Sequence, residues 1–307
     1  MKIKTEQNNL IVGGNGQDAF YLTKFLIKKK QKVILLSNKS LTKKFDYSKY
    51  VLKKKLDIFN QEKVFKYLKK FKNLKVFFLA SHNITAKEKE ISEILKKNLM
   101  INVIGLSNFL EYARKFNKKI KFFYASSSHI FNSSLSKIQN EKTKPDFNSN
   151  YALTKYLGKE ICNFYRKKNV FCSVGILYSH ISKISKKKFL IKDILEQINN
   201  KKKNVKVLDI NSKIDLLAAE DAVEAIYRIM NLNKPDDFII SSNSLVSVKE
   251  IFNKILLKKK KPNIKIVGVI KSKKNPYKLR GNNRKLRDRT FWRPKKSLDN
   301  LISDFVN

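Results

Sequence analysis

The sequence has little glycine, proline or cysteine and no long apolar run, and each scarcity excludes a class of protein. With 8 glycines and 5 prolines in 307 residues it contains no low-complexity linker, so we expect its parts to share one body. Two cysteines, Cys162 and Cys172, allow at most one bridge and exclude a disulfide or zinc framework. No run approaches the ~18 apolar residues of a membrane helix, and the first residues lack the apolar core of a secretory signal. We therefore expect a cytoplasmic protein without a membrane partner.

Acidic residues are also scarce, 25 against 68 Lys and Arg, which gives a net charge of +43. Such a balance normally indicates nucleic acid. The lysines, however, are spread over the whole chain in short runs, such as residues 28–30, 53–55, 186–188 and 258–261. No run is interleaved with aromatic residues as a base-stacking platform requires. We therefore expect no specific nucleic-acid partner, and an RNA- or polyanion-binding protein without catalysis stays open as a second alternative.

A hydrophobic share of 42% is enough for a packed core, and the first half alternates short β-branched runs with helical stretches. Strands are predicted over residues 9–12, 32–36, 50–52, 75–80, 121–125 and 170–177. Long helices are predicted over residues 90–116 and 151–167, and shorter ones near 189–199, 220–230, 247–257 and 297–305. The pattern predicts an α/β fold: a Rossmann-type doubly wound parallel sheet in residues 1–177 and a smaller C-terminal substrate-binding part in residues 178–307. We expect some segments of that second part to return to the main sheet.

A glycine-rich turn follows the first predicted strand and opens a helix, which is the context of a dinucleotide-binding loop. Gly13 permits the tight turn, Gly16 lets the backbone approach a pyrophosphate, and Ala19 allows close packing of helix on strand. Three of the eight glycines in the chain fall within residues 13–16. The turn therefore predicts NAD(P) binding.

The end of the second strand bears on the choice between NAD and NADP. It carries no acidic residue to hold the ribose 2′-hydroxyl of NAD, whereas Lys39 could meet a 2′-phosphate. NADP is therefore favoured over NAD. Asp57, just after the third strand, is a candidate acceptor for the adenine amino group, and an ordinary helix-capping role is the alternative.

A serine run at the end of the fifth strand and a Tyr-x-x-x-Lys pair on the next helix form a catalytic pattern. Residues four apart share a helix face, so Lys155 lies beside Tyr151. We expect the ammonium and a cationic nicotinamide ring to lower the pKa of the phenol, so that Tyr151 can take a proton from a sugar hydroxyl. Ser127 can hydrogen-bond the same oxygen.

With these motifs the chain resembles the extended short-chain dehydrogenases/reductases that act on nucleotide sugars, closest to the GDP-mannose 4,6-dehydratase branch. The resemblance rests on residues 13–22 (GGNGQDAFYL), 124–128 (YASSS), 151–155 (YALTK), 175–180 (GILYSH), 235–240 (PDDFII), 279–286 (LRGNNRKL) and 292–294 (WRP). It implies an NAD(P)-dependent dehydratase that oxidises C4 of a nucleotide sugar by hydride transfer and then eliminates water. It also implies a homodimer or homotetramer, with the two long helices at the dimer interface.

The resemblance extends to individual residues. It implies cofactor contacts from Gln17, Asp18, Ala80, Asn102, Tyr151, Lys155 and His180, and substrate contacts from Ser127, Ser128, Ser179, His180 and Lys192. Asn102 would also order Lys155 and a water.

Three departures from the family pattern keep the reaction open. The dehydratases carry an eliminating Glu where this chain has His129, an imidazole that can also act as acid or base near neutral pH. A family arginine that clamps the pyrophosphate aligns with Ile214, and a family Asn aligns with Ser179. An epimerase or a 4-ketoreductase of the same family is therefore the alternative to a dehydratase.

All three histidines, His82, His129 and His180, follow the predicted ends of strands four, five and six, the edge where such sheets bind ligands. No spacing supports a metal motif, so we expect contacts to substrate or cofactor and no metal. Cys162 and Cys172 are predicted to be buried thiols.

Overall fold

The strands of the main sheet are rich in β-branched and aromatic residues, and they alternate with amphipathic helices. The computed structural model describes residues 8–38, 49–82, 92–131, 137–185, 189–270 and 278–306. The elements up to the end of the sixth strand are β1 (Asn8–Val12), α1 (Gln17–Lys28), β2 (Lys32–Ser37), β3 (Val51–Lys55), α2 (Gln61–Leu68), β4 (Leu74–Phe78), α3 (Ser92–Leu99), η1 (Met100–Gly105), α4 (Leu106–Phe116), β5 (Lys121–Ser127), η2 (Ser128–Ile130), α5 (Asn150–Arg166) and β6 (Phe171–Leu177). The remainder is β7 (Ser179–Ile181), α6 (Leu190–Asn199), β8 (Asn204–Val207), β9 (Lys213–Ala218), α7 (Ala219–Ile229), β10 (Asp237–Ile240), β11 (Leu245–Ser247), α8 (Val248–Lys259), β12 (Lys265–Gly268), β13 (Lys278–Leu279), α9 (Arg284–Thr290) and α10 (Leu298–Val306).

The main sheet has seven strands in the order β10-β6-β5-β4-β1-β2-β3, and all its pairs are parallel. The direction in which the chain adds strands reverses between β1 and β4, so the loops after these two strands open a crevice at that point. The predicted doubly wound parallel sheet is confirmed. The lysines 53–55 lie on the edge strand β3, where charged side chains discourage pairing with another sheet.

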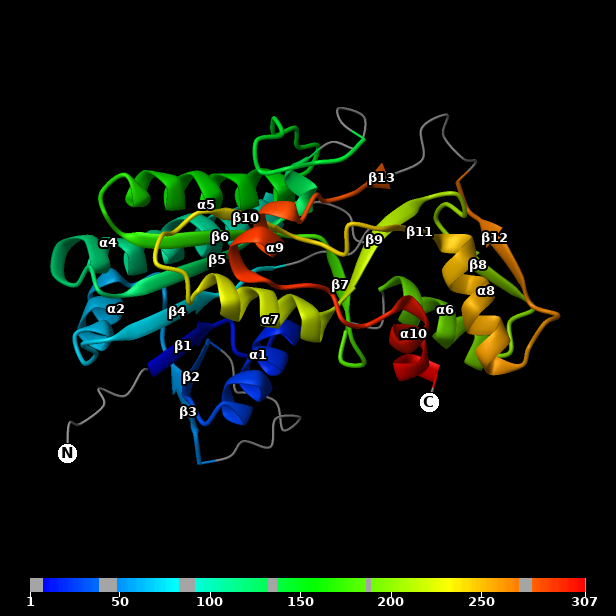
Figure 1. Ribbon diagram of the computed structural model, residues 1–307, viewed down its shortest axis with the longest axis horizontal. Coiled ribbons are helices and arrows are strands. Elements are labelled where there is room, and N and C mark those ends of the chain that lie inside the picture. Colours follow the sequence, from blue (N-terminus) through cyan, green and yellow to red (C-terminus); the bar gives the residue numbers. More distant parts are fainter. Residues whose placement is uncertain are drawn as a thin grey trace.

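Helices cover both faces of this sheet, as Figure 1 shows with α4 and α5 on one side and α1 and α7 on the other. Both faces are therefore apolar, and neighbouring residues of one strand enter different cores: Leu10 and Val12 of β1 pack with Phe109 on one face, and Ile11 packs with Leu26 and Ile226 on the other. None of the described helices is both long and apolar enough to span a membrane. Cys162 and Cys172 are free and buried, as predicted.

The predicted helix over residues 90–116 is interrupted. Residues 90 and 91 lie outside the described part, and from Ser92 onward α3 and α4 are separated by the wider π turn η1. Asn102 and Gly105 lie in this turn and are buried. π turns inside helices recur at functional sites because they change the direction of a side chain, and here the turn aims Asn102 toward α5.

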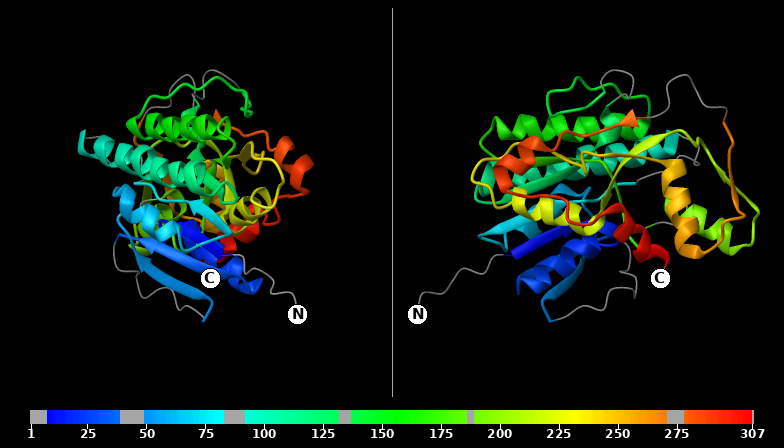
Figure 2. Two further views of the ribbon diagram at one scale, coloured as in Figure 1. Left: turned by 90° about the vertical axis from the view of Figure 1, so that its left-hand side faces the viewer. Right: turned by 45° about the vertical axis from the view of Figure 1, so that its right-hand side comes forward.

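The chain after Leu177 contributes both to the main sheet and to two smaller sheets. β7 pairs with β9 in a small sheet with β11 and β13, and β8 pairs with β12. Helices α6, α8 and α10 pack around these strands on the side away from α4 (Figures 1 and 2). β10, in contrast, pairs with β6 in the main sheet, and the buried Trp292 packs in the same core as α1 and α7.

Candidate active site

The residues singled out in the sequence follow the carboxyl ends of neighbouring parallel strands. Gly13 follows β1, Ser127 ends β5, and His180 lies in β7 just after β6. Because these strands run parallel, their ends meet at one edge of the sheet. The folded chain therefore brings together segments that lie far apart in the sequence.

The glycine turn has the geometry of a phosphate loop. Gly13 has φ +98°, and a Cβ there would lie 2.7 Å from the backbone N and Cα of Ala80 in the loop after β4. The amides of Gly13 and Gly14 both donate to the Leu36 carbonyl at the end of β2. Gly16 is the N-cap of α1 and provides no side-chain cap, so the first amides of the helix remain available to an anion.

The start of α1 is tied to the segment after β6. Asp18 accepts hydrogen bonds from Nε2 of His180 at 2.9 and 3.0 Å, and Nδ1 of His180 lies 2.8 Å from the Tyr178 carbonyl. Burial alone lowers the pKa of His180, but the Asp18 carboxylate and the Tyr178 carbonyl outweigh it and raise the pKa to about 9. His180 is therefore a cation at neutral pH.

Gln17 strengthens the same connection between α1 and β7. Its side-chain amide donates to the His180 carbonyl at 3.3 Å, and its Oε1 accepts from the hydroxyls of Ser182 and Ser185 at 2.8 and 2.6 Å. The predicted cofactor residues Gln17, Asp18 and His180 thus form one hydrogen-bonded group.

Tyr151 and Lys155 lie in the first turns of α5, which Ser149 caps by accepting from the Ala152 amide. The Lys155 side chain is 2% exposed, and its Nζ donates to the Ala125 carbonyl at 2.8 Å and to Asn102 Oδ1 at 3.2 Å. The ammonium lies 5.9 Å from the centre of the Tyr151 ring. The implied contact between Asn102 and Lys155 is therefore present in the fold.

The expectation that the pKa of Tyr151 is lowered is wrong for the chain by itself. Burial raises the pKa of the phenol to about 12, against an opposing hydrogen bond from Ser127. Burial also lowers the pKa of Lys155 to about 7, and the Asp18 carboxylate offsets part of that effect. The low polarity of the site disfavours charge on both groups, and the Lys155 Nζ is directed at Ala125 and Asn102.

His129 lies beside Tyr151, in the short helix η2. Its backbone amide donates to Ser127 Oγ at 3.3 Å, and its ring meets the Tyr151 ring edge-on at 5.9 Å between centroids. The His129 side chain is exposed, whereas Ser127 and Ser128 are buried. The imidazole can therefore reach a molecule that occupies the space in front of Tyr151.

The remaining residues that the sequence predicted as cofactor or substrate contacts are spread over several elements. Lys39 falls outside the described residues. The Asp57 carboxylate is exposed and accepts from the Phe59 amide, the bond of an ordinary turn. Ser179 is exposed and pairs in register with Leu216 of β9, and Lys192 lies half-buried in the first turn of α6.

Ile214, which aligns with the family arginine that this chain lacks, lies in β9 between the backbones of β11 and β13. The neighbouring Asp215 is buried, and its carboxylate accepts from the amides of Ser242, Asn243 and Gly281. Asp215 therefore joins β9 to the loops after β10 and β13, and its carboxylate is already saturated with donors.

Sequence reasoning missed two residues of the site. The hydroxyl of Ser81 is buried beside the Tyr151 hydroxyl, and its hydrogen bond opposes the rise in the pKa of that phenol. Tyr124 donates its hydroxyl to Asn102 Oδ1 at 3.2 Å. Ser81 could have been found from its place just after the fourth strand, but nothing in the sequence indicates the bond of Tyr124.

Comparison with known proteins decides the family. A model of the GDP-mannose 4,6 dehydratase family matches residues 10–305. The chain belongs to this family. The GDP-mannose 4,6 dehydratase of Drosophila melanogaster is 25% identical over 78% of this chain and 65% of its own length, so the chain spans about two thirds of that relative. GDP-mannose 4,6 dehydratase 1 of Arabidopsis thaliana is 25% identical over 99% of this chain and 90% of its own length.

Solved structures of nucleotide-sugar epimerases and dehydratases have the same fold. A UDP-glucose 4-epimerase of Thermotoga maritima with UDP-glucose superposes with TM-score 0.84 and 19% identity, covering 97% of both chains. A dTDP-glucose 4,6-dehydratase of Bacillus anthracis in complex with NAD gives TM-score 0.82 and 19% identity, covering 98% of this chain and 95% of its own. The resemblance read from the sequence, to an enzyme family of dehydratases and epimerases, is confirmed.

The described residues fit a dinucleotide. The uncapped start of α1 and the close approach of Gly13 to the Ala80 backbone lie around the crevice between β1 and β4. No three His, Cys, Asp or Glu side chains of the described part gather as metal ligands would.

Proposed function

We propose that this protein binds NAD(P) and modifies a nucleotide-activated sugar by oxidising its C4, with loss of water from the sugar as the leading outcome. Family membership supports the substrate class. The observation that carries the proposal is the meeting of Tyr151, Lys155 and Ser127 at the strand ends beside the Gly13 loop. Residues 178–307 supply the sugar-nucleotide contacts, from Ser179, His180 and Lys192.

The chain's own residues handle the proton. A bound nicotinamide ring would supply the redox chemistry, by accepting hydride from C4 of the sugar and giving it back at C6 after water has left. Tyr151 accepts the proton of the C4 hydroxyl, and Ser127 hydrogen-bonds the same oxygen. Lys155, whose pKa is about 7, is held by Asn102 and the Ala125 carbonyl and exchanges a proton easily at neutral pH.

His129 decides between the dehydratase and its alternatives. Elimination of water needs one group to remove the proton beside the C4 ketone and one to protonate the departing hydroxyl, and the imidazole beside Tyr151 can do both. We expect His129→Ala to stop loss of water while hydride transfer continues, and His129→Glu to raise dehydration. If neither substitution changes the product, the epimerase or 4-ketoreductase takes precedence.

Binding of the cofactor is tested first. Gly16→Val places a branched side chain where a pyrophosphate approaches the backbone, and calorimetry should show loss of NAD and NADP binding. Unchanged affinity would show that the loop has another role. Mass spectrometry of ligands released from the denatured, purified protein then identifies the sugar nucleotide.

The finer properties of this enzyme are also proposals. We infer a preference for NADP because β2 ends in Leu36 and Ser37 and is followed by Asn38, without an acidic side chain. Comparison of NADP and NAD affinities tests it. We also infer a cytoplasmic enzyme, in keeping with its two unbridged cysteines.

A homodimer through the long helices is supported by apolar side chains on their outer faces. Met100 and Ile104 of η1 and Phe164 of α5 are 39%, 44% and 56% exposed. Light scattering after size exclusion should give twice the mass of 35.9 kDa, and Phe164→Asp should lower it. A monomeric mass at high concentration would refute the dimer, and a fourfold mass would indicate a homotetramer.

A further inference from the structure

Tyr124 lies in the middle of β5, three residues before Ser127, and its hydroxyl has a partner in the active site. The side chain is buried, and its ring packs beside that of Phe78 at 6.3 Å between centroids. Burial raises the pKa of the phenol well above its ordinary value, so the hydroxyl stays protonated and acts as a donor. It donates to Asn102 Oδ1 at 3.2 Å. A side chain of the core thereby joins β5 to the π turn η1.

The Asn102 amide is bound at both of its ends. Its oxygen accepts from the Tyr124 hydroxyl and from Lys155 Nζ, each at 3.2 Å. Its nitrogen donates to Thr154 Oγ1 at 3.4 Å, and that hydroxyl donates to the Tyr151 carbonyl at 3.0 Å. An amide turned over by half a rotation would present N–H groups to Lys155, and an ammonium cannot accept them. As a second donor to the oxygen, the Tyr124 hydroxyl favours the orientation that serves Lys155.

Lys155 depends on this orientation for its direction. Of the three N–H groups of an ammonium, one donates to the Ala125 carbonyl at 2.8 Å and one to Asn102. Because an ammonium is tetrahedral, two fixed bonds also fix the direction of the third N–H. Nζ lies 5.1 Å from the centre of the Tyr124 ring and 5.9 Å from that of Tyr151. Loss of the Asn102 bond would let the third N–H turn away from a molecule bound at Tyr151.

The fold makes room for the Tyr124 hydroxyl at a cost to α5. Gly158 lies within α5, less than one turn after Lys155, and a Cβ there would lie too close to the hydroxyl and ring of Tyr124. Glycine inside a helix lowers stability relative to alanine. The chain has only 8 glycines, and one of them stands where a side chain would displace this hydroxyl. Residues on β5 and α5 therefore place the hydroxyl together.

We propose that Tyr124 is a positioning residue for the reaction at Tyr151: its hydroxyl holds the Asn102 amide with the oxygen toward Lys155 and so fixes the direction of the ammonium. This role rests on the function proposed above and deepens it. A phenylalanine at position 124 would keep the ring, with its contact to Lys155, and lose only the hydroxyl. Tyr124→Phe should therefore fold, and it separates positioning from packing.

The Asn102 amide reports on this role without any substrate. In protein labelled with 15N-asparagine, the side-chain signal of Asn102 is the one that disappears in Asn102→Asp. We expect Tyr124→Phe to make hydrogen exchange of this signal at least about tenfold faster, because one bond of the amide is lost. Backbone amides of α5 should exchange at unchanged rates. Unchanged exchange at Asn102, or faster exchange throughout α5, would overturn the positioning role.

Turnover of GDP-mannose by the NAD(P)-loaded enzyme tests the consequence. Tyr124→Phe should lower kcat at least about tenfold and leave KM within roughly twofold, because Tyr124 acts on the orientation of Lys155 and not on binding. A raised KM with unchanged kcat, or no change in either, would refute the role. If the unsubstituted protein does not turn over GDP-mannose, the proposed function fails for that sugar, and the Asn102 signal still decides the role of Tyr124.

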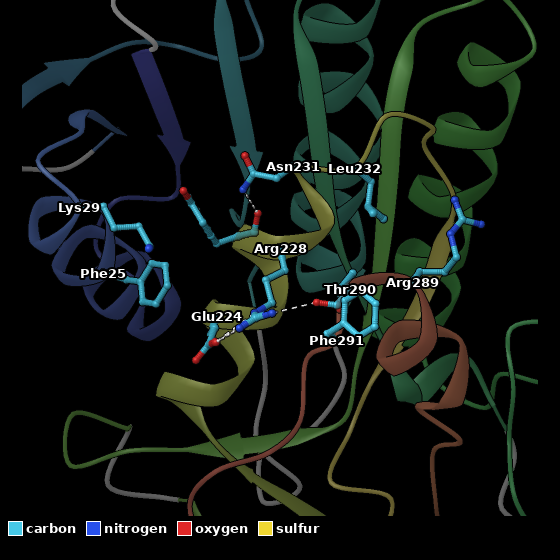
Figure 3. Close-up of a pocket in the computed structure, with 10 residues that line it drawn as sticks. Phe25, Lys29, Glu224, Arg228, Asn231, Leu232, Arg289, Thr290 and Phe291 are labelled. Atoms are coloured by element: carbon cyan, nitrogen blue, oxygen red, sulfur yellow. Dashed lines mark hydrogen bonds and ion pairs between the residues drawn. The ribbon is translucent and has the colours of Figure 1, made fainter.

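Two hydrogen-bonded tyrosines provide matched controls. Tyr165, near the end of α5, donates its hydroxyl to Glu111 Oε2 at 3.0 Å. Tyr227, on α7 at the other face of the main sheet, packs on Phe25 in the surface hollow of about 440 Å³ that Figure 3 shows. Its hydroxyl accepts from Gln31 at 3.2 Å. Tyr165→Phe and Tyr227→Phe should leave kcat and the Asn102 signal unchanged. An equal loss of kcat in either control would overturn the positioning role, because any lost hydroxyl would then have the same effect.

Discussion

The opposite pKa shifts of His180 and Lys155 should make the free energy of unfolding nearly independent of pH between 7 and 9. One substitution, Lys155→Met, should remove that balance. His180 has a folded pKa of about 9 against an ordinary 6.5, because the Asp18 carboxylate and the Tyr178 carbonyl outweigh burial. Lys155 has a folded pKa of about 7 against an ordinary 10.5, because burial disfavours its charge. The two groups lie in one site but shift in opposite directions.

Each shift links stability to pH with its own sign. Between pH 6.5 and 9 folded His180 keeps a proton that the unfolded chain has lost, so its contribution is complete below 6.5 and disappears as pH rises through 9. Between pH 7 and 10.5 the unfolded chain protonates Lys155 and the folded chain does not, so stability rises with pH. Each slope is about 1.4 kcal/mol per pH unit, and from pH 7 to 9 they cancel.

Lys155→Met should expose the His180 slope. The free energy of unfolding should fall by about 3 kcal/mol between pH 7 and 9, because the His180 slope then acts alone over two pH units, while the unsubstituted chain stays nearly constant. Urea unfolding at half-unit pH steps, without cofactor, measures both curves. Groups common to both chains cancel in the difference.

Lys159→Met is the matched control. Lys159 lies one turn further along α5 and pairs with Asp237 at 3.2 Å, and its pKa is raised, because the Asp237 and Glu160 carboxylates together outweigh burial. It therefore stays protonated throughout the interval in both states, and its removal should leave the flat profile unchanged. A flat profile in Lys155→Met would refute the opposed titration of His180 and Lys155.

Three glycine-related changes test the packing. Gly13→Ala should abolish NAD(P) binding and lower Tm, because its Cβ would lie 2.7 Å from the Ala80 backbone at φ +98°. Calorimetry and a thermal melt measure these two effects, and normal binding would refute the prediction. Gly158→Ala should destabilise the chain by about 1–3 kcal/mol, because its Cβ would lie too close to the Tyr124 hydroxyl. Urea unfolding of the double variant with Tyr124→Phe should show that part of this loss is restored. Phe291→Gly should stabilise the chain by about 1 kcal/mol by relieving the left-handed backbone, and a lower Tm would contradict that strain.

Local sequence patterns were enough to predict most of the helices and strands and the family. The alternation of β-branched runs with amphipathic stretches predicts the doubly wound sheet, because a parallel sheet with both faces covered needs that order. The glycine turn, the serine run and the Tyr151 and Lys155 pair are each contained within a few residues, so their spacing is readable without the fold. The break in the long helix at η1 was not predicted, because a π turn leaves the apolar spacing almost unchanged.

The sequence by itself determined the fold class and the family, and it predicted a cofactor loop and a catalytic pair, because these depend on neighbours along the chain. Only the tertiary structure decided how the site is charged. Asp18 and His180 are 162 residues apart, and their contact, with the burial of Lys155 and Tyr151, moves three pKa values away from their ordinary range. Such shifts depend on burial and on partners from distant strands, and no local pattern encodes either.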